Sequence, residues 1–255
     1  MRAWHLIGDG EPKVFVDSLG MALVGITEDQ VRDLLSAGTV PSTAIWVLRG
    51  RFAEDRLRQA RERGVEQYVI LGAGLDTFAL RHMNDLDKLV VFEVDDPPMQ
   101  VWKRKRLAEL GLSVPESLHF VPCDFETMSI GDVLQPASFL PRSPAFVSWL
   151  GVTQYLTEDA IAQTLRWAST LASGSEIVFT FVLPTEEAQT WKQDALDGVR
   201  FETFFAPDEM ASLVNDAGLT VAELLTADEA NLRYFANRSD DLRASASELL
   251  IVAAV

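Results

Sequence analysis

Short apolar runs alternate with segments of helical periodicity along most of the chain after residue 66. Seven runs are apolar at nearly every position, which is typical of strands buried on both faces: QYVILG (67–72), KLVVFEV (88–94), LHFVPCD (118–124), PAFVSWL (144–150), SEIVFTFVL (175–183), LTVAELL (219–225) and LLIVAAV (249–255). Helical patterns lie between them at 75–83, 97–110, 158–172 and 207–218. Because buried parallel strands need helices on both faces, this alternation predicts an α/β fold with a mainly parallel, seven-stranded sheet.

The first 48 residues differ from the rest, because turn residues interrupt short helical pieces there. In TEDQVRDLLSAG (27–38), Thr27 and Gln30 have the spacing of a capping box, and Gly38 is a suitable helix stop. The segment 50–63 follows as a strong helix former. We predict a single domain over residues 1–255, with 1–48 as a helical lid or flank and 49–255 as a Rossmann-like core.

The amino-acid composition argues against several classes of function. The chain of 255 residues carries a formal net charge of −16, which argues against nucleic acid as a partner. A single cysteine, Cys123, excludes a disulfide framework and a cysteine-rich metal site, and we expect no metal. No stretch has the length of a membrane span, and the N-terminal apolar run is too short for a signal peptide. We therefore expect a cytoplasmic protein, and the sequence leaves open whether it forms a homo-oligomer.

The ends of the first three predicted strands carry residues suited to an adenosine-containing ligand. Gly72 and Gly74 end the first strand, where glycine lets the backbone approach a ligand, and a helix predicted from Leu75 would favour an anionic group. Glu93, followed by Val94, is expected to end the second strand and to accept hydrogen bonds from ribose hydroxyls. The third strand is expected to end at Asp124 and Phe125, which could receive the adenine. Parallel strands place these ends at one edge of the sheet.

Two cofactor classes fit such an edge. A dinucleotide fingerprint needs a third glycine, but position 77 is threonine. Asp76 also stands in the turn, where it would repel a pyrophosphate but suit the ammonium of S-adenosylmethionine. We therefore predict S-adenosylmethionine rather than NAD.

Several blocks go beyond general chemistry and resemble a known family. RGRFAEDRL (49–57), QYVILGAGLDTFALR (67–81) and VVFEVDDPPMQVWKRKRL (90–107) are similar to the leucine carboxyl methyltransferase-like family, in particular to its bacterial S-adenosylmethionine-dependent branch with members linked to polyketide O-methylation. The resemblance implies a class I methyltransferase fold, with six parallel strands and the last strand inserted antiparallel between the fifth and sixth.

The same resemblance implies a set of cofactor-binding residues. An arginine of the RGRFAED block would hold the methionine carboxylate, with Arg51 as the first choice and Arg49 as the second. The remaining members of the predicted set are Gly72, Ala73, Gly74, Asp76, Glu93, Val94, Asp124, Phe125 and Leu150.

One position departs from the family pattern. Members that methylate a protein C-terminus carry a glutamate where SWLGVTQYL (148–156) has Leu150. We therefore expect a small-molecule acceptor, with O-methylation of a carboxylate or hydroxyl in secondary metabolism, rather than a protein substrate.

The catalytic residues stay unknown at this point. A carboxylate acceptor needs no general base, whereas a hydroxyl acceptor can require one, for which Tyr155 and His5 are candidates. Trp149 and Tyr155 are the preferred acceptor-binding pair; further aromatic candidates are Trp4, Phe15, Trp46, Phe204 and Phe205. The alternatives are a non-catalytic cofactor-binding or scaffold protein and an NAD-dependent oxidoreductase on the same sheet.

Overall fold

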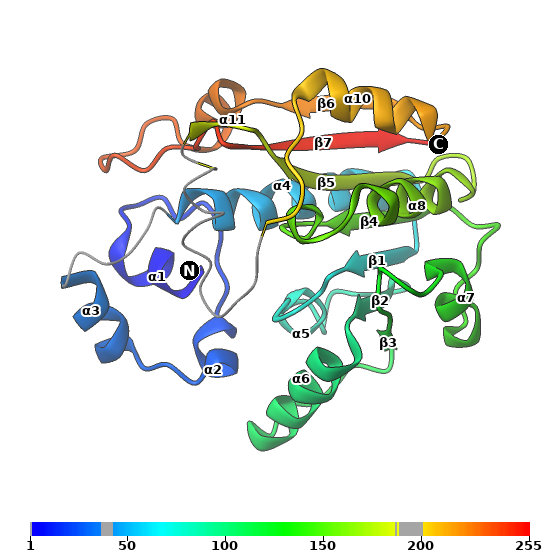
Figure 1. The fold of residues 1–255 in the computed structure, drawn as a ribbon. Coiled ribbons are helices and arrows are strands. Elements are labelled where there is room, and N and C mark those ends of the chain that lie inside the picture. The colour runs from blue at the N-terminus through cyan, green and yellow to red at the C-terminus, as the bar shows by residue number, and fades with distance from the viewer. Residues whose placement is uncertain (1, 37–42, 187, 189–200) are drawn as a thin grey trace.

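The protein folds around one seven-stranded sheet, seen in a computed structural model that describes residues 2–36, 43–186, 188 and 201–255 (Figure 1). The strands are β1 (Gln67–Leu71), β2 (Val90–Asp95), β3 (Leu118–Pro122), β4 (Ala145–Trp149), β5 (Glu176–Val182), β6 (Thr220–Leu225) and β7 (Glu248–Ala254). Their order in the sheet is β3-β2-β1-β4-β5-β7-β6, and β7 runs antiparallel to both of its neighbours. The predicted seven strands and the inserted antiparallel strand are confirmed.

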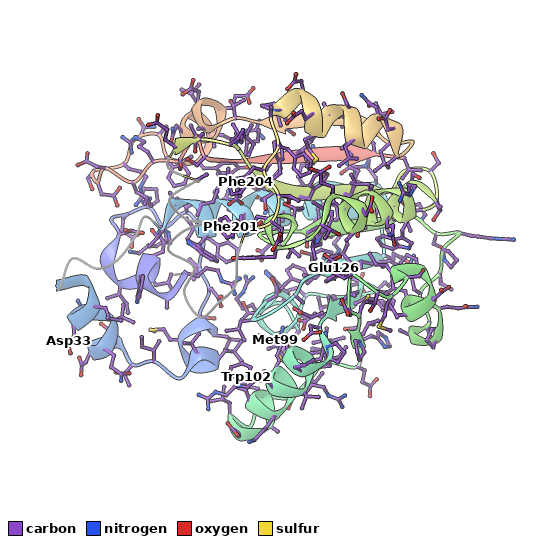
Figure 2. The ribbon with its side chains drawn as sticks, in the orientation of Figure 1. Asp33, Met99, Trp102, Glu126, Phe201 and Phe204 are labelled. Carbon is purple, nitrogen blue, oxygen red and sulfur yellow. The ribbon has the colours of Figure 1, made fainter. Side chains whose placement is uncertain are left out.

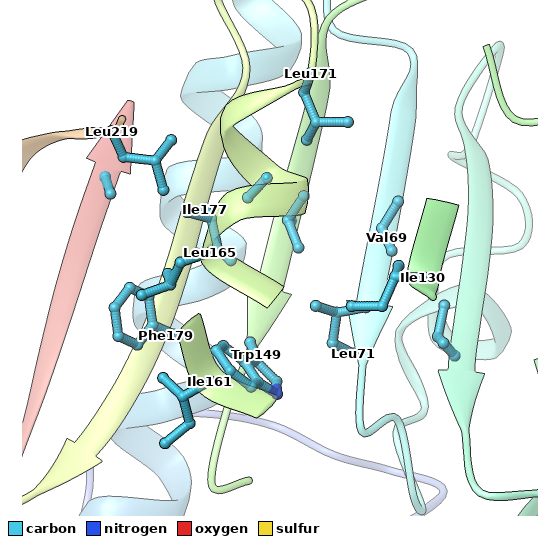
Figure 3. Close-up of a cluster of buried hydrophobic side chains, with 14 of the residues drawn as sticks. Val69, Leu71, Ile130, Trp149, Ile161, Leu165, Leu171, Ile177, Phe179 and Leu219 are labelled. Atoms are coloured by element: carbon cyan, nitrogen blue, oxygen red, sulfur yellow. The ribbon is translucent and has the colours of Figure 1, made fainter. Parts of the chain in front are cut away.

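Two hydrophobic clusters lie on opposite faces of this sheet, because successive strand residues point to opposite sides. Val69 and Leu71 of β1 belong to one cluster and Tyr68 and Ile70 to the other. The first cluster packs against α7 (Ile130–Leu134), α8 (Glu158–Ser169) and α10 (Pro207–Asp216), and Figure 3 shows its centre. The second packs against α4 (Ala44–Glu62), α5 (Phe78–Arg81) and α11 (Ala227–Tyr234). Both faces are covered, as the apolar strands require.

The N-terminal part forms α1 (Arg2–Gly8), α2 (Gly20–Val24) and α3 (Glu28–Ser36), which lie on the side toward which the parallel strands point (Figure 1). The predicted capping box at the start of α3 is confirmed, because the Thr27 amide donates to Gln30 Oε1 at 2.9 Å and the Gln30 amide donates to Thr27 Oγ1 at 3.3 Å. The predicted stop at Gly38 lies outside the described residues. This region therefore covers the carboxyl edge of the sheet.

Two helix starts differ from the sequence prediction. α4 begins at Ala44 rather than at residue 50, because Ala44, Val47 and Leu48 extend its buried stripe toward the N-terminus. α5 begins at Phe78 rather than at Leu75, because Gly74 has a φ of +45° and Asp76 Oδ1 accepts the Phe78 amide at 2.7 Å. Residues 72–77 consequently form a turn instead of a helix N-terminus.

Some elements carried too little periodicity to be predicted. These are the helices α7 and α11 and the single-turn 3₁₀ helices at Gln135–Ala137 (η1) and Thr153–Tyr155 (η2). Helix α6 (Pro97–Glu109), in contrast, lies where it was expected. Among the described helices, none has both the length and the apolar character needed to cross a membrane.

Candidate functional site

A cavity of about 390 Å³ lies at the carboxyl ends of β1 and β4, next to the N-terminal helices. That volume is within the range of small-molecule sites. One part of its wall is the chain that leaves β1, from Ile70 to Asp76, and another is the chain that leaves β4, from Leu150 to Val152. The N-terminal part contributes Arg2, Ala3, Gly20, Val24, Trp46 and Arg49. The predicted edge of the sheet therefore carries the cavity.

The glycine turn after β1 is shaped by close backbone contacts. Gly72 has a φ of +66°, and a Cβ at this position would lie 2.2 Å from Val152 Cγ2. The amides of Gly72 and Ala73 both donate to the carbonyl of Val94, at 2.8 and 3.2 Å, which ties the turn to β2. Only glycine fits here, and Val152 packs directly against the backbone of the turn. The structure thus places Gly72, Ala73, Gly74 and Asp76 in the cavity wall, as predicted.

The structure corrects the choice between the two arginines. Arg49, and not Arg51, lines the cavity. Its Nε donates to Glu248 Oε1 at 2.6 Å, a second guanidinium nitrogen pairs with Glu248 Oε2, and the guanidinium lies 4.8 Å from the Trp46 ring. Arg51 instead bonds Asp55 at 2.8 Å and is 43% exposed.

Helix geometry explains this outcome. Residues two apart on an α-helix lie about 200° apart around its axis, so Arg49 and Arg51 point to different sides. Arg49 falls in line with the buried positions Ala53, Leu57 and Ala60 of α4. The spacing of these apolar residues was the sequence signal that could have selected Arg49.

A second correction concerns the acidic residue of β2. The strand runs two residues beyond Glu93 and ends at Asp95, so Glu93 lies inside the sheet and is fully buried. Its carboxylate accepts from Lys103 Nζ at 2.5 Å. Asp95 occupies the strand end, where Oδ2 accepts the amide of Gly74 and Oδ1 accepts the amide of Asp96. Asp95, which the sequence reading overlooked, is the acid placed where a ribose acceptor was expected.

Burial dominates the electrostatics of both acids. It raises the pKa of Glu93 to about 7, against the opposing charge of Lys103. Burial also raises the pKa of Asp95, while the amides of Gly74 and Asp96 oppose the rise by hydrogen bonding to the carboxylate. Asp95 is only partly buried and remains open to a further hydrogen-bond donor from solvent or ligand.

Asp124 and Phe125 lie in the loop that follows β3, and they are not part of the cavity wall. β3 ends at Pro122, two residues before the expected end. Asp124 is partly buried and holds this loop, since it accepts from the Glu126 amide at 3.0 Å and from Thr127 Oγ1 at 2.8 Å. An adenine-binding role for this pair stays a prediction.

Two neighbouring residues at the end of β4 line the cavity. Leu150 lines the cavity, and so does Gly151, whose φ is +70° and whose amide donates to Thr180 Oγ1 at 2.7 Å. A Cβ on Gly151 would lie 2.3 Å from an Arg49 guanidinium nitrogen. Gly151 therefore leaves room for Arg49, and its position after an apolar strand was the signal that was missed.

Trp149 is not an acceptor-binding residue. It is fully buried in the hydrophobic cluster between the sheet and α8, where its ring lies 5.9 Å from that of Phe179 (Figure 3). The prediction was wrong because β4 continues through Trp149, which points its side chain to the face opposite the cavity.

Tyr155 and His5 also lie outside the cavity wall. Tyr155 ends η2, is 40% exposed, and packs edge to face on Phe201, with 5.2 Å between the ring centroids. His5 is fully buried in α1: Nδ1 is 2.7 Å from Asp9 Oδ2, and Nε2 accepts the Val14 amide at 2.9 Å. With both ring nitrogens engaged, His5 is a structural residue and not a general base. Trp46, a further aromatic candidate, does line the cavity.

The comparison with known proteins identifies the family. A family model described as "Leucine carboxyl methyltransferase" matches residues 1–169, which is more than half of the chain. The chain belongs to the leucine carboxyl methyltransferase family. The resemblance predicted from the LGAGLDT and FEVDDPP blocks is thereby confirmed, and the prediction of a methyltransferase is confirmed at the level of the family.

Two relatives of this chain share the same description. A Bacillus subtilis protein named "Putative S-adenosyl-L-methionine-dependent methyltransferase YktD" is 35% identical over 206 residues, covering 77% of this chain and 67% of its own length. A Mycobacterium tuberculosis protein of the same description is 33% identical over 140 residues, covering 54% of this chain. The chain spans only 45% of that relative's own length. The predicted cofactor, S-adenosylmethionine, is the one that these names carry.

Solved structures support the fold. A "putative methyltransferase" from Thermobifida fusca superposes with a TM-score of 0.61, 18% identity and 94% coverage of both chains. Magnesium protoporphyrin IX methyltransferase from Synechocystis, solved with bound S-adenosylhomocysteine (SAH), gives a TM-score of 0.52 at 14% identity, covering 83% of this chain and 85% of its own. At such identities the likeness concerns the fold, which is the predicted class I methyltransferase fold.

Proposed function

We propose that the chain is an S-adenosylmethionine-dependent methyltransferase that transfers a methyl group to an oxygen atom of a small molecule. The observation that carries this proposal is the meeting of the glycine turn, Arg49 and the end of β4 in one cavity. Neither Gly72 nor Gly151 can carry a Cβ, because Val152 and the Arg49 guanidinium pack directly against their backbone, and this close packing brings the three segments together around the cavity. These residues fit the cofactor named for the relatives of this family.

Arg49 would hold the carboxylate of the cofactor's methionine moiety. Glu248 takes two of its guanidinium nitrogens, and the third lies beside Gly151 on the cavity side. The ion pair with Glu248 and the contact with the Trp46 ring fix the guanidinium in place before a ligand binds. Asp76, also in the wall, would face the ammonium group, and Asp95 would receive the ribose hydroxyls.

The acceptor that the cavity favours is a carboxylate. Among the described residues of the wall, the ionisable side chains are Arg2, Arg49 and Asp76, and with Asp76 assigned to the cofactor ammonium no general base is left for a hydroxyl acceptor. When bound, S-adenosylmethionine supplies the methyl group and a thioether leaving group. The protein then aligns an already ionised oxygen with the methyl carbon and keeps water out, with no proton to remove. Trp46, Leu150 and Val152 supply apolar surface for the body of such an acceptor.

Calorimetric titration tests the cofactor assignment. Wild-type protein is titrated with S-adenosylmethionine and with SAH, and NAD serves as the ligand control. We expect binding of the first two ligands only. Binding of NAD alone would overturn the proposal in favour of an oxidoreductase, whereas binding of none would contradict any cofactor role for the cavity.

A matched pair of variants tests the role of Arg49. Arg49→Lys keeps the charge beside Glu248 but loses the forked pairing, so we expect about tenfold weaker binding of SAH. Arg51→Lys lies on the same helix outside the cavity and should bind as the wild type does. Equal affinities of the two variants would contradict the assignment.

Transfer itself is tested with methyl-labelled cofactor and a small-molecule extract. A methyl ester releases labelled methanol in mild alkali, whereas a methyl ether does not, so the alkaline release separates a carboxylate acceptor from a hydroxyl acceptor. Labelled product that resists alkali would redirect the proposal to a hydroxyl. Tight cofactor binding without any transfer would favour a non-catalytic binding protein.

A further inference from the structure

A buried ion pair lies next to the turn that follows β1. Lys103 of α6 and Glu93 of β2 are 2% and 1% exposed, and Lys103 Nζ lies 2.5 Å from Glu93 Oε2. Glu93 Oε1 has no hydrogen-bond partner among the described residues. Burial of such a pair is often no more stabilising than apolar packing of the same volume. Its presence between α6 and β2, beside the buried Gln100 that donates to the Glu93 carbonyl at 2.8 Å, therefore needs a reason other than stability.

The lysine reaches beyond its ion-pair partner. Its Nζ also donates to the carbonyl of Asp76 at 2.7 Å, in the turn that forms the cavity wall. The side chains of Met99 and Trp102 on the same helix are exposed (Figure 2), whereas Gln100, Lys103 and Leu107 form its buried face. One ammonium group thus joins α6, the middle of β2 and the turn after β1.

Further hydrogen bonds shape the turn from Gly72 to Asp76. Gly74 donates to Asp95, the Asp76 amide donates to the Ala73 carbonyl at 2.7 Å, and Asp76 Oδ1 accepts from Phe78. The amides of Gly72, Ala73 and Gly74 connect the first half of the turn to β2. Lys103 connects the other end of the turn, at the Asp76 carbonyl, to β2 through its pair with Glu93.

We propose that Lys103, held in place by Glu93, is a positioning residue that fixes the turn from Gly72 to Asp76 in the shape that receives the cofactor. This inference rests on the proposed function, since it concerns the same cavity. An ammonium group can donate three hydrogen bonds, and here it serves the carboxylate of Glu93 and the carbonyl of Asp76 together. Glu93 directs the lysine side chain, and Lys103 makes the contact with the turn.

Two variants separate positioning from simple stability. Glu93→Gln keeps an acceptor for Lys103 but removes its counter-charge, so SAH affinity should fall, though less than in the double variant. Glu93→Gln combined with Lys103→Met removes the contact with Asp76 without leaving a buried charge unpaired, and affinity should fall about tenfold.

A control ion pair, less deeply buried, lies at the opposite edge of the sheet. Arg56 and Glu176 form a pair at 2.9 Å, with side chains 17% and 13% exposed, and Glu176 starts β5 far from the carboxyl edge. Arg56→Met with Glu176→Gln should lower the stability and leave SAH affinity unchanged.

Hydrogen–deuterium exchange supplies the local readout, with each variant compared to the wild type in the absence of ligand. The double variant at 93 and 103 should exchange faster in the peptide covering 72–78 and unchanged in the peptide covering β7. Wild-type affinity and wild-type exchange in that variant would overturn the inference. If the wild type itself binds no SAH, the proposed function fails, while exchange in 72–78 still decides whether Lys103 fixes the turn.

Discussion

Single residues were assigned well where chemistry alone determines the residue type, and poorly where position within an element matters. Gly72 was found because a positive φ at +66° and a close contact both require glycine. Glu93 was named and Asp95 was overlooked because a sequence pattern leaves the end of a strand uncertain by about two residues. Those two residues decide whether the carboxylate lies inside the sheet with Lys103 or at its edge beside Gly74.

The buried carboxyl of Glu93 makes a pH dependence predictable. Burial raises its pKa from 4.5 to about 7, with Lys103 opposing the rise and Asp76 adding to it. The unfolded chain releases this proton near its ordinary pKa, whereas the folded protein retains it until about pH 7. Since the folded state binds more protons in this interval, the free energy of unfolding should fall as pH rises from about 4.5 to 7.

The measurement compares denaturant unfolding of the wild type with that of the variant carrying Glu93→Gln and Lys103→Met, between pH 5 and pH 8. The stability of the wild type relative to the variant should decline up to about pH 7 and then level off. A relative stability that rises with pH would contradict the assigned direction of the Glu93 pKa.

Whole elements followed local rules wherever caps and apolar periodicity agreed. α3 and α8 both begin after a threonine whose hydroxyl accepts the amide three residues on, at Thr27 and Thr157. α5 broke the pattern, because Asp76 bonded the amide of Phe78 and closed a turn in place of the first helical turn. Short polar side chains compete with helix starts in this way, and sequence periodicity does not register the competition.

The cap of α8 is also a tertiary contact, which makes its removal informative. Thr157 Oγ1 accepts the Ala160 amide at 3.3 Å and donates to Glu126 Oε2 at 2.8 Å, in the loop after β3. Thr157→Ala should therefore lower the free energy of unfolding by about 1 to 2 kcal/mol, measured by denaturant titration.

Thr170→Ala is the control at the other end of α8, where the hydroxyl bonds only its own helix at the Trp167 carbonyl. Its effect should be within about 0.5 kcal/mol of zero, as for most surface substitutions. Equal losses in the two variants would show that the N-cap and its loop contact add nothing particular.

At the scale of the molecule, one buried aspartate connects the N-terminal helices to the turn after β1. Asp17 is 1% exposed; Oδ1 accepts from Thr77 Oγ1 at 2.8 Å and from the Gly20 amide at 3.0 Å, and Oδ2 lies 3.1 Å from Arg2 Nε. Arg2 also donates to the carbonyl of Leu75 at 2.7 Å. These contacts hold α1 and α2 against the turn that follows β1.

Asp17→Asn should loosen this connection, because an amide donor replaces one acceptor oxygen and leaves Arg2 without its counter-charge. We expect a loss of about 2 to 4 kcal/mol in the free energy of unfolding and faster cleavage of the N-terminal segment in limited proteolysis. Asp33→Asn, an exposed position on α3 in the same region (Figure 2), is the control and should behave as wild type. Protease resistance equal to that of the control would contradict the role of Asp17.

The sequence by itself determined the fold, the family and the glycine turn. Continuous apolar strands, alternating helices and the LGAGLDT block are local patterns, and each has few structural solutions. Only the tertiary structure decided which arginine lines the cavity, which acid ends β2, that Trp149 packs in the core, and that Lys103 reaches the turn. These outcomes depend on where a helix starts and where a strand ends, because a shift of one or two residues turns a side chain to another face.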